Sequence, residues 1–167
     1  QIIMVFAQFE RKQTSERDTA VMLSRASNGQ WNGGRIAYGY SYNKEEKLFS
    51  LHPVENKIYN IICDTYEQYQ STLYVSRYLN SLGYRTRQGN EWTPTAIHKI
   101  LSNPFYTGDY AYNVHDDGRG KSKRDKNEWV RIEDHHVPSI SHERFDRIQF
   151  ILTRNKRGGN IKGESRI

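Results

Sequence analysis

The first 28 residues contain neither glycine nor proline, and this uninterrupted run limits the possible architectures more than any other segment. Good helix formers fill it, so we expect one helix about 42 Å long at a rise of 1.5 Å per residue. Its first nine residues, QIIMVFAQF, are apolar on nearly every side, whereas residues 10–19 are almost entirely polar. The apolar start therefore needs a covering surface that this chain lacks. Because the chain also begins at Gln1 rather than at Met, we expect it to be a segment of a longer protein.

The residues after this helix predict short helices and short strands. A Gly-rich segment, the connector (residues 28–40), comes first. Apolar residues at helical spacing then predict helices from Pro53 to about 66 and over 71–82, 94–102 and 141–155. Thr93 and Ser141 are the expected N-caps of the last two, and Pro53 and Pro94 suit the first position of a helix.

Strands are expected over 47–51, 105–114 and 128–137, the last two joined by a charged loop. Residues 85–93 predict a small basic hairpin around a Gly-Asn turn. Helix 71–82 is expected to point five apolar side chains inward: Leu73, Val75, Tyr78, Leu79 and Leu82. The fold class is therefore α+β, a long N-terminal helix followed by a mixed domain of about four helices. That domain should contain small antiparallel β-hairpins and a helix-turn-helix-like unit.

Composition excludes several classes of protein. The single Cys excludes disulfides within the chain and any multi-cysteine zinc site, and the apolar neighbours of Cys63 predict a buried, inert thiol. The sequence has no apolar run of the roughly 18 residues needed to span a membrane and no signal segment. We therefore expect a soluble, cytoplasmic protein without a cofactor and without membrane contact.

Two patterns that might suggest chemistry have simpler interpretations. His135, His136 and His142 lie near acidic residues, but adjacent histidines on a strand point to opposite faces, so structural roles are favoured over a metal site. The sequence contains no Ser-His-Asp order, no P-loop and no GxGxxG motif. We expect neither a metal nor catalytic residues in this chain.

The most informative pattern is the pair of helices 71–82 and 94–102. Ile97, Ile100 and Leu101 share one face of the second helix, while the other face presents Thr95, His98, Lys99 and Ser102. A short helix with such a polar face can enter the major groove of DNA and contact base edges. The connection between the helices is about eleven residues, longer than the usual three or four, so the unit would be a variant. An ordinary helical hairpin with a solvated outer face explains this pattern equally well.

The connector offers a second possible contact with DNA. Trp31, Asn32 and Arg35 lie in a Gly-rich extended stretch, as in the arms with which other proteins follow a minor groove. A plain interdomain linker would have the same composition. The net charge of +6 supports phosphate contact only loosely, and the positive excess lies in residues 1–40, 71–107 and 141–167.

Four segments follow one another in a distinctive order: AQFERKQTSERD (7–18), GQWNGGRIAYGY (29–40), YLNSLGYRTRQGNEWTPTAIHKILSNPFYTG (78–108) and HHVPSISHERFDRIQFIL (135–152). In this order they resemble the large serine recombinases, which include phage integrases and transposon resolvases. The resemblance covers residues 1 to about 155. One departure is Ala37, where the family usually has Pro before Tyr-Gly-Tyr, and this makes the exit of the linker less rigid.

The resemblance implies a division of the chain into four parts. Residues 1–28 would be the C-terminal part of the long helix that leaves the catalytic domain, 29–36 a minor-groove linker, 37–155 the recombinase DNA-binding domain, and 156–167 a basic tail. In this family a serine attacks the scissile phosphodiester to give a 5′-phosphoserine, and arginines stabilise the transition state. Those residues would lie upstream of Gln1, so we expect this segment to be inactive alone, although its parent protein would be a DNA recombinase.

The expected function is recognition of an attachment half-site during integration, excision or transposition of a mobile element. The expected partners are double-stranded DNA, the protein's own catalytic domain, and other copies of the full-length protein in a dimer or a tetramer on DNA. Two alternatives remain, a non-catalytic helix-turn-helix transcriptional regulator and an RNA-binding protein. The candidate DNA-binding residues are Arg11, Arg17, Arg25, Trp31, Asn32, Arg35, Arg85, Thr86, Arg87, Thr93, Thr95, His98 and Lys99.

Overall fold

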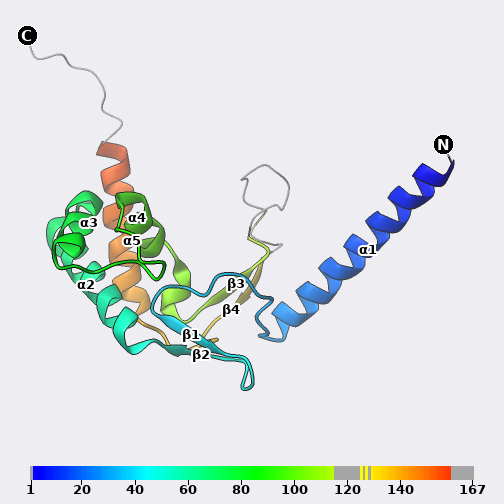
Figure 1. Ribbon diagram of the computed structural model, residues 1–167, viewed down its shortest axis with the longest axis horizontal. Helices are drawn as coiled ribbons and strands as arrows, with labels where there is room; N and C mark the ends of the chain where they lie inside the picture. The colour runs from blue at the N-terminus through cyan, green and yellow to red at the C-terminus, as the bar shows by residue number, and fades with distance from the viewer. Residues whose placement is uncertain (1, 115–124, 126, 128, 159–167) are drawn as a thin grey trace, which may run out of the picture.

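A long helix projects from a small mixed domain in the computed structural model of the chain (Figure 1). The structure describes residues 2–114, 125, 127 and 129–158, so most of the expected charged loop and of the basic tail lie outside the described residues. The helices are α1 (Ile2–Ser27), α2 (Pro53–Tyr69), α3 (Thr72–Ser81), α4 (Pro94–Leu101) and α5 (His142–Gly158), with a short 3-10 helix η1 (Pro104–Thr107). The strands are β1 (Tyr40–Asn43), β2 (Leu48–Leu51), β3 (Tyr110–Tyr112) and β4 (Val130–Ile132).

The strands form two separate antiparallel hairpins, β1 with β2 and β3 with β4. Tyr40 pairs with Leu51 in the first, and Tyr110 pairs with Ile132 in the second. The helices and hairpins together confirm the expected α+β class. Strand β1 was not among the expected strands. It begins at Tyr40, the last residue of the segment that the sequence predicted to be a connector.

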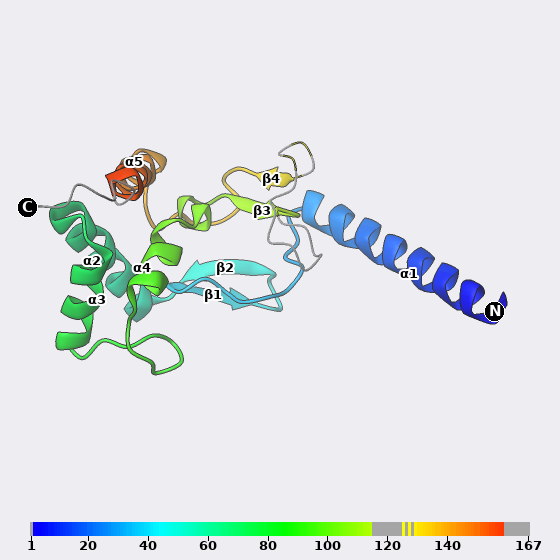
Figure 2. The same cartoon turned by 90° about the horizontal axis from the view of Figure 1, so that it is seen from above.

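The core lies where α2, α3, α4 and α5 meet. Its fully buried members include Tyr59, Ile62, Leu79, Ile97 and Ile148, one or two from each of these helices. The rings of Tyr59 and Tyr106 stack with their centroids 3.8 Å apart, which joins α2 to η1. Figure 2 shows α4 and the loop before it on one side of this helical group and α5 on the other.

Local sequence signals fixed the ends of the helices. The side chain of Thr93 accepts a hydrogen bond from the Ala96 N–H (3.2 Å), and that of Ser141 accepts one from the Arg144 N–H (3.3 Å). Both expected N-caps are therefore confirmed, because capping depends only on residues within one turn. Within the described residues, no helix is long and apolar enough to cross a bilayer.

Two expectations about the domain were wrong. Residues 85–93 form no strands; the loop is closed instead by a turn in which Thr86 and Asn90 bond through their backbones (2.9 Å). Leu73 and Tyr78 on α3 and Leu82 at its C-cap are exposed, and only Val75, Ser76 and Leu79 of the helix are buried. α3 therefore buries a narrower stripe than the periodicity of its apolar residues indicated, because it packs against α2 and α4 on one side only.

Strand lengths also differed from those expected. Residues 105–107 belong to η1, and only 110–112 of the expected segment 105–114 is a strand. Within the expected segment 128–137, only 130–132 is a strand. Asn103, whose side chain accepts from the Phe105 N–H (3.1 Å), begins η1 in the way that an N-cap begins a helix.

Candidate nucleic-acid interface

The outer face of α4 is polar and accessible. Thr95, His98 and Lys99 are exposed, whereas Ile97 and Leu101 are buried against the core. The His98 Nδ1 lies 3.4 Å from the Ser102 hydroxyl, and no described residue makes a hydrogen bond or ion pair with the Lys99 ammonium. A helix of eight residues is about 12 Å long, and this one presents its polar side chains away from the domain.

A pair of hydrogen bonds fixes the position of α4 relative to α3. The Asn80 side chain donates to the Trp92 carbonyl (2.9 Å) and accepts from the Trp92 N–H (2.8 Å). Asn80 thus ties the last turn of α3 to the residue before the N-cap of α4. Sequence reasoning missed this contact, since nothing local to Asn80 indicates a partner in the next loop. The two helices are consequently held as one unit despite their long connection.

The loop between α3 and α4 places its two arginines in different surroundings. Arg85 is exposed and donates to the carbonyls of Asn80 (3.3 Å) and Tyr84 (2.9 Å), with Glu91 3.9 Å from its guanidinium. Arg87 points to the connector instead, where it donates to the Ile36 carbonyl (3.0 Å) and pairs with Glu55. The hydroxyl of Thr86 accepts from the Asn90 N–H (3.2 Å) and so closes the turn.

Both ends of the connector are anchored to the domain. Trp31 packs on Tyr42 and Phe49, with ring centroids 4.6 and 5.8 Å apart. Asn32 donates to the carbonyl of Met22 in α1 (2.7 Å). At the other end, the Tyr106 hydroxyl donates to the Tyr38 carbonyl (2.8 Å). Trp31 and Asn32 therefore hold the connector in place, in addition to any contact they make with a ligand.

The middle of the connector is free of these contacts. Gly33, Gly34 and Arg35 are exposed, and both glycines have positive φ angles, +94° and +106°. Gly33 and Arg35 line a surface hollow together with Asn103 and Phe105, which are the N-cap and the second residue of η1. The exposed stretch of the connector therefore lies beside the start of η1, the short helix that follows α4.

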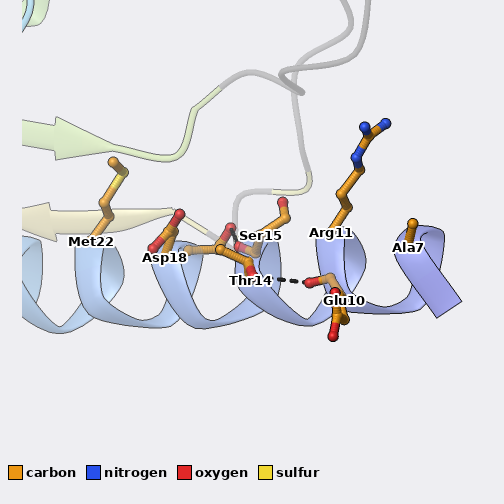
Figure 3. Close-up of a pocket in the computed structure, with 8 residues that line it drawn as sticks. Ala7, Glu10, Arg11, Thr14, Ser15, Asp18 and Met22 are labelled. Carbon is orange, nitrogen blue, oxygen red and sulfur yellow. Dashed lines mark hydrogen bonds between the residues drawn. The ribbon is translucent and has the colours of Figure 1, made fainter.

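The arginines of α1 are exposed along a helix that stands apart from the domain. Figure 3 shows Arg11 extending away from the helix, above a face that carries Thr14, Ser15 and Asp18. Arg17 and Arg25 are also exposed. The Thr14 hydroxyl donates to the Glu10 carbonyl (2.9 Å), a bond within the helix that involves no other element. Within the described part of the chain, only the end of α1 approaches another element, β4 (Figure 1).

The remaining titratable candidates have structural roles. Burial raises the pKa of the Cys63 thiol to about 12, so the group is protonated and inert. His135 and His136 lie 2.7 and 2.8 Å from the Gly29 and Phe105 carbonyls, which they can each bond through Nε2. Among the described residues, no cluster of His, Cys, Asp or Glu could hold a metal ion.

The structure thus brings some of the candidate residues together and separates others. Thr95, His98 and Lys99 share one exposed face of α4. Arg35 lies beside η1, the short helix that follows α4. Thr86, Thr93 and Arg87 have their polar atoms engaged within the protein. The structure also shows exposed tyrosines on α3, Tyr74 and Tyr78, whose rings stack 6.3 Å apart.

These features define a class of protein. Its members contain a helix-turn-helix-like pair inside a small α+β domain, and an anchored connector precedes that domain. The family model "Recombinase" matches residues 53–155, from the start of α2 into α5. The chain therefore belongs to the recombinase family. This match confirms the resemblance to the serine recombinases at the level of the family.

A curated relative has a name that agrees with this family. The chain is 25% identical over 166 residues to the "Putative DNA recombinase" of Bacillus subtilis (strain 168), covering 90% of this chain and 33% of that protein. It therefore spans about a third of the length of this relative.

Two solved chains share the fold, each with a TM-score of 0.65 and 24% identity over 89% of this chain. One is described as "Crystal Structure of a LSR-DNA Complex" and is covered to 42%. The other is described as "Sequence Requirements of the Listeria innocua prophage attP site" and is covered to 56%.

Proposed function

We propose that this chain is the DNA-binding part of a serine site-specific recombinase and that it recognises an attachment half-site. The observation that carries the proposal is the outer face of α4, where Thr95, His98 and Lys99 are exposed while the opposite face is buried. A helix about 12 Å long fits the major groove, which is about 12 Å wide. Family membership and the names of the relatives support DNA as the ligand.

In this proposal the connector contacts the minor groove next to the segment read by α4. Gly33 and Gly34 carry no side chain that would keep the backbone away from the floor of a narrow groove, and Arg35 is exposed beside them. Arg11, Arg17 and Arg25 would contact phosphates where α1 passes the duplex. Arg85 would contact phosphate from the loop before α4.

The parent protein is proposed to recombine DNA through a catalytic domain that precedes α1, and the present chain is expected to cleave no DNA alone. Copies of the full-length protein would meet on the DNA as a dimer or a tetramer. Since its substrate is duplex DNA, we expect the protein to act in the cytoplasm.

The test is a selection from randomised duplexes, followed by titration of binding to the selected sequence against salt. We expect an asymmetric motif of about ten base pairs and an affinity that falls steeply as the salt concentration rises. A preference for single strands or RNA, or no selected motif, would contradict the proposal and favour the RNA-binding alternative. A full-length protein that binds the motif but never cleaves beside it would favour the transcriptional regulator.

Substitutions on α4 separate base contacts from phosphate contacts. Lys99→Ala should weaken binding to all duplexes alike and lower the salt dependence by about one ion, if Lys99 meets a phosphate. Thr95→Ala should instead change the preferred base at one position, at a cost of about 1–3 kcal/mol for the original base. Lys44→Ala, an exposed lysine in the turn after β1, is the control and should leave both properties unchanged. A base-selective loss in Lys99→Ala would reject its phosphate role.

A further inference from the structure

Arg87 is surrounded by acceptors that belong to the protein. Its Nη1 donates to the Ile36 carbonyl (3.0 Å), and its Nη2 donates to the carbonyls of Ala37 (3.3 Å) and Tyr40 (2.9 Å). Its Nε donates to Glu55 Oε1 (2.8 Å), and Nη2 also pairs with Glu55 Oε2. Although 41% of the side chain is exposed, most of the five donors of the guanidinium are occupied. Arg87 is therefore poorly placed to bind a phosphate or a base.

Glu55 completes the arrangement from the first turn of α2. Its side chain is only 13% exposed, and Oε2 also accepts the N–H of Gly39 (2.8 Å). Burial alone would raise the pKa of this carboxyl, but the hydrogen bonds from Arg87 and Gly39 outweigh it and hold the pKa below its ordinary value. The carboxylate is thus charged at neutral pH, and the pair is an ion pair that also bonds the backbone.

Three parts of the structure meet at this pair. The carbonyls of Ile36, Ala37 and Tyr40 belong to the end of the connector, Glu55 belongs to α2, and Arg87 belongs to the loop before α4. That loop is rigidly joined to α4, since Asn80 holds Trp92 at its end and the turn from Thr86 to Asn90 closes its middle. The pair therefore fixes the end of the connector to the segment that carries α4.

We infer that Arg87 and Glu55 are a positioning pair that sets the spacing between the DNA segment contacted by the connector and the segment read by α4. This inference rests on the proposed function. Neither residue needs to touch DNA, because Arg87 acts through the three carbonyls that it bonds and Glu55 through the Gly39 N–H and through Arg87. The side chain of Ala37 does not restrain its own φ angle, so the bond from Arg87 to the Ala37 carbonyl holds a position that is otherwise free to turn.

The chemistry of the pair explains why arginine is required. A guanidinium offers donors in a planar fork and can bond a carboxylate and several carbonyls at once. A lysine at this position could keep one bond to Glu55, but its single ammonium cannot reach all three carbonyls in different directions. Arg87→Lys should therefore keep the charge and lose the hold on the connector.

The test uses the selected half-site with one base pair inserted or removed between the segment protected in the minor groove and that protected in the major groove. One base pair moves the two segments by about 3.4 Å and rotates them by about 35°. We expect the unaltered protein to lose about tenfold in affinity at either altered spacing. Arg87→Lys, Arg87→Gln and Glu55→Gln should bind all three duplexes with affinities within about threefold of one another.

Gln88→Ala is the matched control, because Gln88 is exposed in the same loop and is not among the residues that hold the connector. It should keep the tenfold preference for the original spacing. A pair that served only stability would weaken binding at every spacing by the same factor, so variants that retain the full spacing preference would overturn the inference while leaving the proposed function intact. Unaltered protein that binds no duplex would overturn both. Failure of all three variants to fold at 10 °C would assign the pair to stability and reject the positioning role.

Discussion

Gly108, between η1 and β3, occupies a backbone position that no larger residue can take without a shift of the chain. Its φ angle is +93°, and a Cβ there would lie 2.8 Å from the His136 carbonyl oxygen. The Gly108 carbonyl itself accepts the N–H groups of His135 (2.9 Å) and His136 (3.2 Å). These contacts bring the segment after β4 against η1, and they leave no room for a side chain.

Gly108→Ala should therefore lower the free energy of unfolding by about 2 kcal/mol or more, the combined cost of the left-handed conformation and the clash. Urea unfolding measures this cost. Gly83→Ala is the control, since Gly83 has a φ angle of +79° with no atom within 4 Å of an added Cβ. It should lose only about 1 kcal/mol. Equal losses in the two variants would show that the backbone near Gly108 adapts.

His135 and His136 form a second close contact in the same region. Their Nδ1 atoms lie 3.1 Å apart, and each Nε2 faces a backbone carbonyl. Burial, together with the neighbouring His135, lowers the pKa of His136 to about 4, against the opposing effects of the Phe105 carbonyl and Asp109. The ring of His136 is therefore neutral at pH 7 and donates to the Phe105 carbonyl.

This pKa predicts how stability depends on pH. The unfolded chain binds a proton at His136 near pH 6.5 and the folded chain only near pH 4, so the free energy of unfolding should fall as the pH decreases from about 6.5 to about 4. His136→Gln keeps a donor for the Phe105 carbonyl but cannot titrate. Its urea midpoint should change less between pH 7 and pH 4.5 than that of the unaltered protein. Identical changes would mean that other groups cause the acid sensitivity.

At the scale of the element, one side chain caps the start of α4, and other side chains form its exposed outer face. Thr93 accepts the Ala96 N–H at the N-cap, whereas Thr95 is exposed and makes no such bond. The two threonines are two positions apart, yet one contributes to the helix and the other is available to a ligand. This contrast allows the two roles to be measured separately.

Thr93→Ala should lower the free energy of unfolding by about 1 kcal/mol, and Thr93→Ser should restore it. Thr95→Ala should leave stability within about 0.5 kcal/mol of the unaltered protein, because it is a surface substitution, and should change DNA binding instead. Urea unfolding and duplex titration of the three variants check this division. Loss of stability in Thr95→Ala, with none in Thr93→Ala, would reverse the two assignments.

At the scale of the whole molecule, the described residues join α1 to the domain only near the end of the helix. Met4, Phe6 and Phe9 are 73%, 65% and 63% exposed, whereas Ala26 is fully buried. No described residue covers these three side chains at the start of α1, as the sequence predicted, and exposed apolar surface of this kind favours association.

Removal of residues 1–17 should leave the urea midpoint of the domain unchanged and reduce self-association in sedimentation experiments. Removal of residues 1–26 is the control and should destabilise the domain, since it deletes Ala26 and the Met22 carbonyl that Asn32 bonds. A lower midpoint in the shorter deletion would show that the first half of α1 packs on the domain.

The sequence by itself determined the helices, their caps and the family. A run of 28 residues without glycine or proline became α1, and Thr93, Pro94 and Ser141 marked helix ends, because these signals act over one turn of chain. The polar face of α4 also followed from periodicity alone. In each case the deciding residues are neighbours along the sequence.

Only the tertiary structure decided which polar and apolar side chains are engaged. Arg87 was a candidate DNA-binding residue by sequence. In the structure it forms hydrogen bonds with Glu55, Tyr40, Ala37 and Ile36, which lie 32, 47, 50 and 51 positions earlier in the chain. Leu73 of α3 and Leu82 at its C-cap remain exposed because that helix packs on one side, and Trp92, at the end of the loop, bonds Asn80 of α3. Such outcomes depend on groups that are distant in sequence and brought together only by packing of the core, so no local pattern could predict them.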